Sequence, residues 1–497
     1  MNRNRLKQKL FGGVAWQGMQ VLIQDGLIFL LGIILARLLS SADFGVYAIV
    51  FFFITIFEVF SEGGMGVALI QKKHIDHQDC TTVFTFNTVC SLAVVAVIWG
   101  LAPRIATFYQ MPPATGMLRM LSLKILLDNF RVVSYTLLRR RMMFRQLSMS
   151  RIAAVAIGGV IGLMVVLAGG GVWGLVVQQL ATAGIYTGCC FLLMPWKIRF
   201  GYNRRRFRQL FSVGGGILVT QMLIKAADNL YTLIIGKAYS AAALGFYNRA
   251  QALQGIPTSL GQRIVGEAGC TVMYRLQSDD SQLRHITGKL MVVDALIFFP
   301  VLVGIAAVSE PLMVTILGKR WLPGAEYLPF LCIFGVFMQM AYFSKMIYKV
   351  KARIRMLFWS ETATRMVMLV GAAMVCWHGG SIRALLYSGM AAYGTGFLLD
   401  CYLCHRVVRF GLVERLRLLW KVLLGNFLMY VIVRFANNLL FLNGPEWLRL
   451  LLLIVLGVGA YGLCVHIFRI PDYHVALNML KNKFNIRSVP VTSEPGN

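Results

Sequence analysis

The amino-acid sequence predicts an all-α polytopic membrane protein with about fourteen transmembrane helices: two six-helix bundles in parallel pseudo-repeat plus two C-terminal helices. Three observations support this prediction: the apolar composition, the succession of apolar runs, and the placement of basic residues between those runs. Hydrophobic residues make up 58% of the 497 residues and charged residues only 14%, whereas a soluble domain carries about 25% charged residues. The mean hydropathy is +0.68. This composition argues against a soluble enzyme.

The apolar runs follow one another along the chain with short polar breaks. Each is close to the length of about 20 residues that an α-helix needs to cross a bilayer. The first run, Gly13 to Leu39, is too long for a secretory signal and is therefore expected to be a spanning helix. The approximate centres, in order, are Leu27, Ile54, Val94, Leu126, Ile157, Val177, Leu223, Pro257, Pro300, Phe337, Leu369, Ala391, Leu428 and Val455.

The basic residues explain the formal net charge of +29. In a soluble protein this charge would indicate nucleic-acid binding, but here Lys and Arg collect in alternate loops. Roughly 32 of them fall on one side of the predicted membrane and about nine on the other, which orients the helices. We therefore expect both termini in the cytoplasm, an even number of helices, and no nucleic-acid partner.

Two stretches indicate an internal duplication. Residues 36–47 read ARLLSSADFGVY and residues 236–247 read GKAYSAAALGFY. At an offset of 200 residues, Ser40 corresponds to Ser240 and Gly45 corresponds to Gly245. The repeat covers six helices, an even number, so both halves keep one orientation and a substrate site is expected between them. The predicted domains are residues 1–200 and 201–410 for the bundles, 411–470 for two additional helices, and 471–497 for a cytoplasmic tail.

Ionisable residues inside the predicted helices are the main indication of function. Each costs about 2.5–3.5 kcal/mol at a helix centre on insertion scales, so they cannot all face lipid. We expect most of them to pair or to line a polar path. The set comprises Asp25, Glu58, Glu62, Lys124, Asp128, Arg131, Lys225, Asp228, Arg249, Arg263, Glu267, Asp294, Lys345, Glu361 and Arg365.

Three of these cations are candidate contacts for a phosphate-bearing substrate, since Arg and Lys are the usual phosphate partners in proteins. They are Arg131, Lys225 and Arg249. Asp25 and Asp228 are the candidate ion-coupling residues, as carriers of a proton or a cation. The predicted polar lining of the cavity consists of Gln17, Gln24, Gln221 and Asn229, which lie on the first and seventh helices.

Some of the intramembrane charges also fit simpler roles. Lys124 with Asp128, and Glu361 with Arg365, are spaced for pairs within one helix. Glu267 and Asp294 also fit positions near helix ends, where water would solvate them. These alternatives leave open which charges face a cavity.

The sequence predicts no catalytic residue, metal site or cofactor. The seven His residues are dispersed without metal-ligand spacing. Cys401-Tyr-Leu-Cys404-His405 matches the pattern of covalent haem attachment. By the charge argument it lies at the cytoplasmic end of its helix, the opposite side from the one that c-type cytochromes use. Haem is therefore not expected.

Five stretches of the chain match motifs of one known family: ARLLSSADFGVYAIV at 36–50, SEGGMGVALIQKK at 61–73, GVWGLVVQQL at 171–180, ADNLYTLIIGKAYSAAALGFYNRA at 227–250 and GKRWLPGAEYLPFL at 318–331. Through these stretches the chain resembles the polysaccharide-exporter family. This family comprises lipid-linked oligosaccharide flippases of the MATE-like superfamily, with colanic-acid and teichuronic-acid exporters the most similar type. The matching family positions are Arg37, Gly45, Gly66, Gln71, Asp228, Asn229, Gly236, Gly245, Tyr247, Trp321 and Pro323.

The resemblance implies a bacterial inner-membrane protein that moves an undecaprenyl-pyrophosphate-linked repeat unit to the outer leaflet by alternating access. It also implies that exopolysaccharide, capsule or lipopolysaccharide O-antigen synthesis uses the product, and that a proton or sodium gradient drives the step. Membrane lipid is an expected partner, and other polysaccharide-assembly proteins are further candidates. Two alternatives stay open at this point: a cation-coupled multidrug antiporter of the same superfamily, and a membrane enzyme of polysaccharide assembly.

Overall fold

The computed structural model describes residues 23–72, 74–439 and 445–468, and these residues form helices and turns without a strand. The prediction of an all-α protein is confirmed for this part of the chain. Residues 23–38 form the first described helix. It is followed by α2 (Ser41–Glu62), α3 (Met65–Gln71), α4 (His77–Tyr109), α5 (Ala114–Arg140), α6 (Phe144–Val165), the π-helix η1 (Val166–Gly170), α7 (Trp173–Leu193), α8 (Arg204–Asp228) and α9 (Leu230–Ala238).

The second half of the chain is helical in the same way. It contains α10 (Ala241–Gly261), the π-helix η2 (Gln262–Glu267), α11 (Ala268–Arg275), α12 (Asp280–Ala307), α13 (Ser309–Leu317), the 3-10 helix η3 (Lys319–Glu326), α14 (Leu328–Val350), α15 (Ile354–Trp377), α16 (Ile382–Val408), α17 (Leu412–Leu439) and α18 (Glu446–Ile467). Every predicted centre from Leu27 to Val455 lies within one of the described helices.

Eight of the described helices are long and apolar enough to cross a membrane: α2, α4, α6 continued by η1, α7, α12, α14, α17 and α18. The chain is therefore an integral membrane protein. Other helices are also long, but they carry more charge. α5, for example, spans 27 residues and holds Lys124, Asp128 and Arg131 in its middle. Because of such polar centres, length and apolarity alone identify fewer spanning helices than the about fourteen that the sequence predicts.

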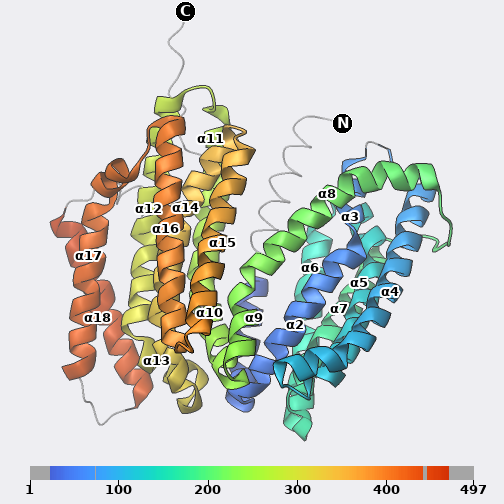
Figure 1. Cartoon of the computed structure of the whole chain (residues 1–497), viewed down its shortest axis with the longest axis horizontal. Helices are drawn as coiled ribbons and strands as arrows, with labels where there is room; N and C mark the ends of the chain where they lie inside the picture. The colour runs from blue at the N-terminus through green and yellow to red at the C-terminus, as the bar shows by residue number, and fades with distance from the viewer. Residues whose placement is uncertain (1–22, 73, 440–444, 469–497) are drawn as a thin grey trace, which may run out of the picture. The chain divides into compact units, whose positions relative to one another are not determined.

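The described chain divides into two compact units, Met1–Asn248 and Arg249–Asn497, called here the first unit and the second unit. The division falls inside α10, later in the chain than the predicted boundary near residue 200. The contacts of α8 explain the difference, because α8 packs on α2, α3 and α4 of the first unit (Figure 1).

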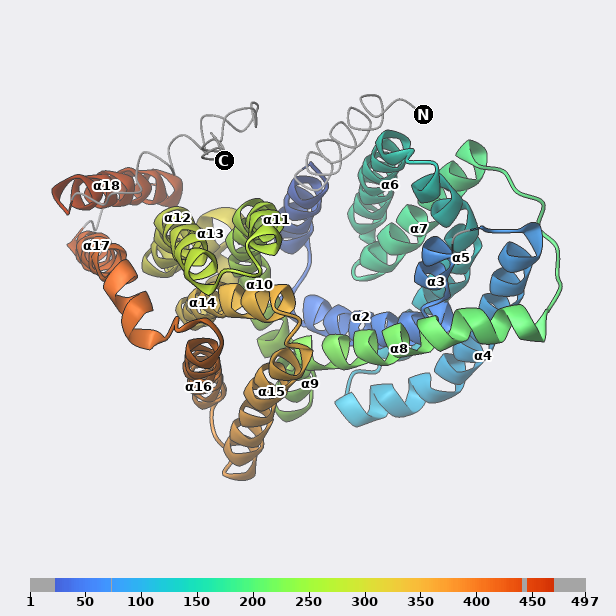
Figure 2. The ribbon, with the colours of Figure 1, turned by 90° about the horizontal axis from the view of Figure 1, so that it is seen from above.

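Backbone-to-backbone packing joins α8 to the turn between α2 and α3. Gly63 and Gly64 both have positive φ, at 55° and 66°, a conformation that glycine adopts without strain. A Cβ on Gly64 would overlap the carbonyl oxygen of Gly214 in α8, and a Cβ on Gly214 would lie 2.8 Å from the carbonyl oxygen of Gly63. Glycines on both sides therefore permit the close approach that Figure 2 shows from above.

The two stretches of the predicted duplication share their local structure. Ser40 caps α2: its Oγ accepts a hydrogen bond from the backbone N–H of Asp43, whose carboxylate accepts one from the N–H of Ser40. Ser240 accepts from the N–H of Ala243 at 3.1 Å in the same way. Both serines stand directly before a helix, α2 or α10.

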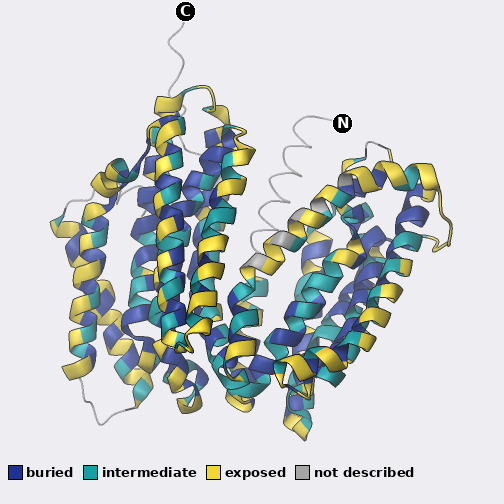
Figure 3. Ribbon diagram, viewed as in Figure 1, coloured by how far each residue is buried: buried dark blue, intermediate teal, exposed yellow. Residues whose placement is uncertain are grey.

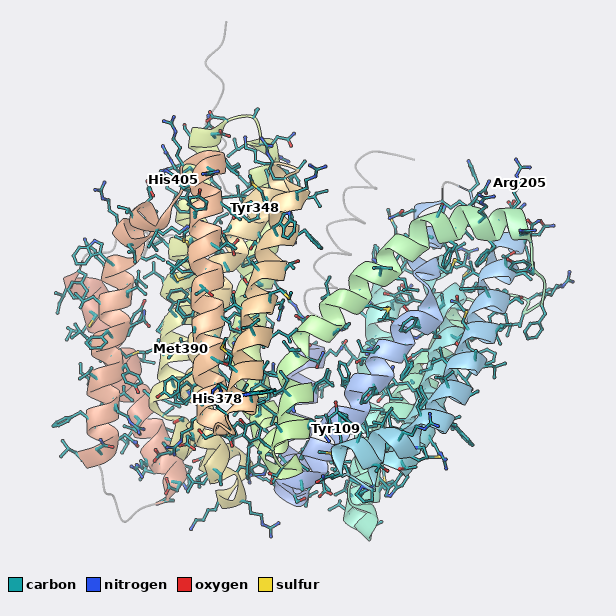
Figure 4. All side chains as sticks on the ribbon, in the orientation of Figure 1. Tyr109, Arg205, Tyr348, His378, Met390 and His405 are labelled. Atoms are coloured by element: carbon teal, nitrogen blue, oxygen red, sulfur yellow. The ribbon has the colours of Figure 1, made fainter. Side chains whose placement is uncertain are left out.

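The second unit is built around α12, α14 and α16, with α15 against α16 and the α17–α18 pair on α12. Its buried surface is concentrated where these helices face one another (Figure 3). Arg415 of α17 is fully buried and donates to the carbonyl oxygen of Met340 at 3.5 Å. Figure 4 shows Tyr348 of α14 toward the same end of this unit as His405, and the Tyr348 hydroxyl donates to the Asp400 carboxylate at 3.2 Å.

Helix α12 corrects one expectation from the sequence. Its N-cap is Asp279, whose carboxylate accepts from the N–H groups of Gln282 and Ser281, and these bonds hold the pKa of that carboxyl below its usual range. The helix therefore starts well before Asp294. Asp294 lies in the middle of α12 with 2% of its surface exposed, so its predicted position inside the helix is confirmed and the alternative of a solvated helix end is wrong.

Candidate functional site

The candidate site begins on one face of α5. Lys124, Asp128, Arg131 and Tyr135 follow one another at i, i+4, i+7 and i+11, the spacing that aligns side chains along one side of an α-helix. This face packs toward α2 and α7, both of which contact α5. Charged and aromatic groups of α5 are therefore directed into the interior of the first unit.

Ion pairs join these groups into one network. The Lys124 ammonium donates to both carboxylate oxygens of Glu58 on α2, at 2.9 Å and 3.0 Å, and to the Asp128 carboxylate at 2.5 Å. Asp128 also accepts from the Arg131 guanidinium at 2.6 Å. Its side chain is only 5% exposed, so two cations compensate one buried carboxylate. The predicted Lys124–Asp128 pair is confirmed, and Glu58 extends it to a second helix.

Aromatic rings hold the arginines on the other side of the network. The Arg131 guanidinium carbon lies 4.7 Å from the ring centre of Tyr186 on α7 and 5.8 Å from that of Tyr135. The guanidinium carbon of Arg151 on α6 lies 5.0 Å from the Tyr186 ring centre. Cation–π attraction of this kind stabilises by about 0.5–2 kcal/mol. The Tyr186 ring therefore positions two cations from two different helices.

These side chains line a cavity of about 250 Å³ within the first unit, called here the first-unit cavity. Its lining residues are Glu58, Lys124, Asp128, Arg131, Tyr135, Arg151, Gln179, Thr182, Ala183 and Tyr186. Three cations and two carboxylates leave one net positive charge. Gln179 and Thr182 add neutral polar groups from α7, so the cavity combines charge, hydrogen-bonding groups and aromatic faces.

The cavity lies deep along α5. Arg131 precedes the last residue of α5, Arg140, by nine residues and Lys124 precedes it by sixteen. At 1.5 Å per residue these separations are about 14 Å and 24 Å, compared with about 30 Å for the hydrocarbon core of a bilayer. The charges therefore lie well away from the C-terminal end of α5.

Of the predicted substrate contacts, Arg131 lines this cavity. Lys225 is an exposed residue near the end of α8 and is not among the lining residues. Its carbonyl oxygen accepts from the side-chain amide of Asn229 at 2.9 Å. Asp228, the last residue of α8, and Gln221 are exposed. These residues share one helix end rather than the first-unit cavity.

The remaining predicted site residues lie on the first helix and on α10. Gln24 and Asp25 are half-buried residues of the helix at 23–38, whereas Gln17 lies outside the described residues. Arg249 is half-buried on α10 and belongs to the second unit. Lys225 is therefore not a lining residue of the cavity that contains Arg131, and Arg249 belongs to the other unit.

Sequence reasoning missed Arg151, Tyr135, Tyr186, Gln179 and Thr182 as site residues. A signal for Tyr135 was present, because it continues the i, i+4, i+7 series of charges on α5. Arg151 lies close to a predicted cytoplasmic loop and resembles an orienting charge. Tyr186 and Thr182 lie in an apolar run in which nothing in the pattern distinguishes the cavity face.

Comparison with known proteins identifies the family of the chain. Residues 34–326 match the family described as "Polysaccharide biosynthesis protein". The chain is 24% identical over 308 residues to the succinoglycan biosynthesis transport protein ExoT of Rhizobium meliloti, covering 62% of each protein. It is 24% identical to the lipopolysaccharide biosynthesis protein WzxC of Escherichia coli over 67% of this chain and 68% of the relative.

A third relative is the teichuronic acid biosynthesis protein TuaB of Bacillus subtilis, 22% identical over 70% of this chain and 72% of the relative. The alignment with ExoT thus spans less than two thirds of that protein, and the other two alignments span slightly more. All three relatives take part, by name, in the biosynthesis of a bacterial polysaccharide.

Two solved structures show the fold. An inward closed conformation of the lipid II flippase MurJ superposes with a TM-score of 0.71 at 14% identity, covering 91% of this chain and 98% of MurJ. An inward-facing multidrug resistance transporter of the MATE family superposes with a TM-score of 0.61 at 16% identity, covering 80% and 98%. The predicted resemblance is confirmed, and the family match covers more than half of the chain: this chain belongs to the polysaccharide biosynthesis protein family.

Proposed function

We propose that this chain flips an undecaprenyl-pyrophosphate-linked oligosaccharide repeat unit across the bacterial cytoplasmic membrane by alternating access. The observation that carries the proposal is the first-unit cavity, which places three cations, two carboxylates and two tyrosines within a membrane-embedded bundle. The names of the relatives connect the family with succinoglycan, lipopolysaccharide and teichuronic acid. The product would serve exopolysaccharide, capsule or O-antigen synthesis.

The chemistry of the cavity fits an anionic saccharide. Arg151 forms no ion pair with any described residue, and the buried Nε of Arg131 has no hydrogen-bond partner there. These donors suit a phosphate or a sugar carboxylate, which Arg binds through charge-assisted hydrogen bonds. Gln179 and Thr182 offer groups for sugar hydroxyls, and the Tyr135 ring offers a face for the apolar side of a sugar.

The proposed architecture has about fourteen spanning helices, six and six related by duplication and two more at the C-terminus. The loops after α5 and α14 support the duplication. Met142 and Ala352 have positive φ of 57° and 52°, and the next N–H groups, of Met143 and Arg353, donate to Leu138 and Tyr348 at 3.1 Å and 2.8 Å. The proposed domains remain 1–200, 201–410, 411–470 and the tail at 471–497.

We further propose an inner-membrane location with both termini in the cytoplasm, from the charge asymmetry of the loops. A proton or sodium gradient would drive transport, with Asp25 and Asp228 as ion carriers. Lys225 and Arg249 remain proposed substrate contacts outside the first-unit cavity. The proposed polar lining is Gln17, Gln24, Gln221 and Asn229. Other polysaccharide-assembly proteins would receive the flipped unit.

A multidrug antiporter is the second candidate, because the fold also occurs in the MATE family. Its substrates would be cations. The first-unit cavity holds one net positive charge, which repels a cationic drug, so the observation favours an anionic substrate.

An enzyme of polysaccharide assembly is a third candidate from another class. Such an enzyme would need a sizeable loop outside the membrane to carry its catalytic groups. Within the described ranges the breaks between successive helices are short, as between α4 and α5, where only residues 110–113 intervene. We therefore propose a transporter rather than an enzyme.

Deletion of the gene in its own bacterium tests the proposal. Lipid-linked repeat units should then accumulate on the cytoplasmic leaflet, where an impermeant sugar oxidant added outside cannot reach them. Replacing Arg131, Lys225 and Arg249 together with Gln should reproduce this defect. Accumulation on the outer leaflet would instead indicate a polymerase or ligase, and susceptibility of the deletion strain to cationic dyes would indicate the antiporter.

A further inference from the structure

A second buried ionisable site lies in the second unit. Asp294 of α12 is 2% exposed, and its neighbours in the helix, Val292, Val293, Ala295 and Leu296, belong to the buried hydrophobic core of the unit. Neither the first-unit cavity nor the sequence prediction of coupling residues includes it. A carboxyl group in such a position is costly to keep ionised, so it needs a specific explanation.

The hydrogen-bond partner of Asp294 among the described residues is an amide. The Gln339 side-chain nitrogen, on α14, lies 3.4 Å from a carboxylate oxygen of Asp294. Gln339 is 1% exposed, and its amide oxygen is buried without a hydrogen-bond partner among the described residues. An amide has a donor end for a carboxylate and an acceptor end for a carboxylic acid. The unused oxygen is the group that a protonated Asp294 would require.

Among the described residues the Asp294 carboxylate forms no ion pair with a cation. The ionisable groups on the helices that pack against α12 have other partners or are exposed: Lys345 and Tyr342 of α14, Asp400 of α16, Arg415 of α17, Tyr461 of α18, Arg263 of η2 and Arg275 of α11. None of these described side chains therefore neutralises the Asp294 carboxyl, and binding of a proton would do so.

The end of α10 closes over the pair. A Cβ on Gly261 would lie 2.7 Å from the Asp294 carboxylate and would overlap the Gln339 amide nitrogen. Directly after Gly261 the chain widens into the π-helix η2, a feature that occurs frequently at functional sites. Gly266 of η2 approaches Tyr342 of α14 as closely, since a Cβ there would lie 2.6 Å from its hydroxyl. Gly261 and Gly266 therefore permit the close approach of this wide turn to α14.

We infer that the Asp294–Gln339 pair is a proton-binding site of the second unit, which takes up the proton whose gradient drives the proposed flipping. In the ionised state the Gln339 nitrogen donates to the Asp294 carboxylate. When a proton binds, the carboxylic acid O–H donates to the Gln339 oxygen, and the amide turns by half a rotation. This turn replaces the amide nitrogen beside Gly261 with its oxygen, so proton binding acts on the junction of α10 and η2. That this proton drives flipping rests on the proposed function. That the pair binds a proton rests on the geometry alone.

Infrared difference spectroscopy of the purified full chain in lipid tests proton binding without any transport assay. A shift from alkaline to acidic pH should produce a carboxylic-acid C=O band that is sensitive to deuterium and absent in Asp294→Asn. Asp400→Asn is the matched control in the same unit, because Ser360 and Tyr348 hold that carboxylate by hydrogen bonds of 2.6 Å and 3.2 Å; its spectrum should keep the Asp294 band. Gln339→Leu should keep the band but shift its frequency, since the acceptor is gone.

Flipping in proteoliposomes then tests the driving role. For one coupled proton, a gradient of one pH unit can sustain about a tenfold concentration ratio of substrate. Wild type should show accumulation that follows the gradient, and Asp294→Asn should equilibrate its substrate without responding to the gradient. Asp280→Asn, an exposed acid at the start of the same helix, should respond like wild type.

The outcomes separate the two claims. Gradient-driven flipping that is unchanged in Asp294→Asn, or an infrared spectrum without a band assignable to Asp294, overturns the inference and leaves the proposed function standing. No flipping by wild type contradicts the proposed function, while the infrared band still decides whether Asp294 binds a proton.

Discussion

At the scale of single residues, Asp128 holds the first-unit cavity together. It is the residue that Lys124 and Arg131 share, at 2.5 Å and 2.6 Å. Glu58 compensates Lys124 from α2, but among the described residues Arg131 forms no other ion pair. The carboxylate of Asp128 is thus the link between the two cations.

Replacing Asp128 with Asn should therefore destabilise the protein strongly. Removing one partner of a buried ion pair leaves an uncompensated charge and costs about 3–5 kcal/mol. The expected result is a clear fall in the thermal unfolding midpoint of the purified protein. Asp280→Asn makes the same chemical change at an exposed pair with Lys351, where the cost is about 0–1 kcal/mol. Equal midpoints for the two variants would show that the network does not stabilise the fold.

The sequence could predict this network in part. The i,i+4 spacing of Lys124 and Asp128 is visible in the sequence, and the structure confirms their contact. The partner Glu58 lies 66 positions away from Lys124, and no local pattern determines which face of α2 meets α5. For Asp294 the apolar run gave no reliable start for α12, so the sequence alone left open whether it lies inside the helix or near its end.

At the scale of elements, the start of α2 and the start of α10 meet at two glycines. A Cβ on Gly45 would overlap the carbonyl oxygen of Ala241, and a Cβ on Gly245 would overlap the carbonyl oxygen of Ser41. The contact is reciprocal, as a symmetric pair of repeats requires, and both glycines are family positions. Only glycine permits this close backbone approach, which explains why both copies of the internal repeat have glycine at this position.

Gly245→Ala should disturb this crossing. The added methyl group meets backbone rather than a mobile side chain, so the helices must separate, at a cost of about 1–3 kcal/mol. Gly255→Ala is a control in the same helix, because nothing lies within 4 Å of its added Cβ, and alanine there should be neutral or slightly stabilising. A Gly245→Ala variant that unfolds no earlier than Gly255→Ala in a thermal melt would rule out this account of the crossing.

The elements themselves were largely predictable, since every predicted centre lies in a described helix. The ends of the helices and the short η segments were less predictable from the sequence. The sequence indicates the N-cap at Ser40, because Asp43 follows three residues later and completes a capping box. The segments η1 and η2, in contrast, depend on packing. η2, for instance, is held where Gly266 approaches Tyr342, a contact between residues far apart in the chain.

At the scale of the whole molecule, the proposed topology places both termini in the cytoplasm. Reporter fusions at two loops test it, one after Gln110, between α4 and α5, and one after Arg141, between α5 and α6. We expect a periplasm-dependent phosphatase to be active after Gln110 and inactive after Arg141, because basic residues gather at the second loop. A reporter that folds only in the cytoplasm should give the inverse pattern and should be active after the C-terminal residue Asn497. The same activity at both loops would refute the charge argument.

The central claim is that the first-unit cavity binds the anionic group of a lipid-linked saccharide during flipping. The most direct measurement is flipping of undecaprenyl-pyrophosphate-linked oligosaccharide by the purified chain in proteoliposomes, compared between wild type, Arg151→Gln and Arg205→Gln. Arg151 faces the cavity without an ion pair to a described residue, whereas Arg205 is exposed at the start of α8 (Figure 4). We predict that Arg151→Gln slows flipping about tenfold or more, since a hydrogen bond to a charged group is worth about 1.5–3 kcal/mol, while Arg205→Gln flips at the wild-type rate. Flipping by Arg151→Gln at the rate of Arg205→Gln would contradict the claim.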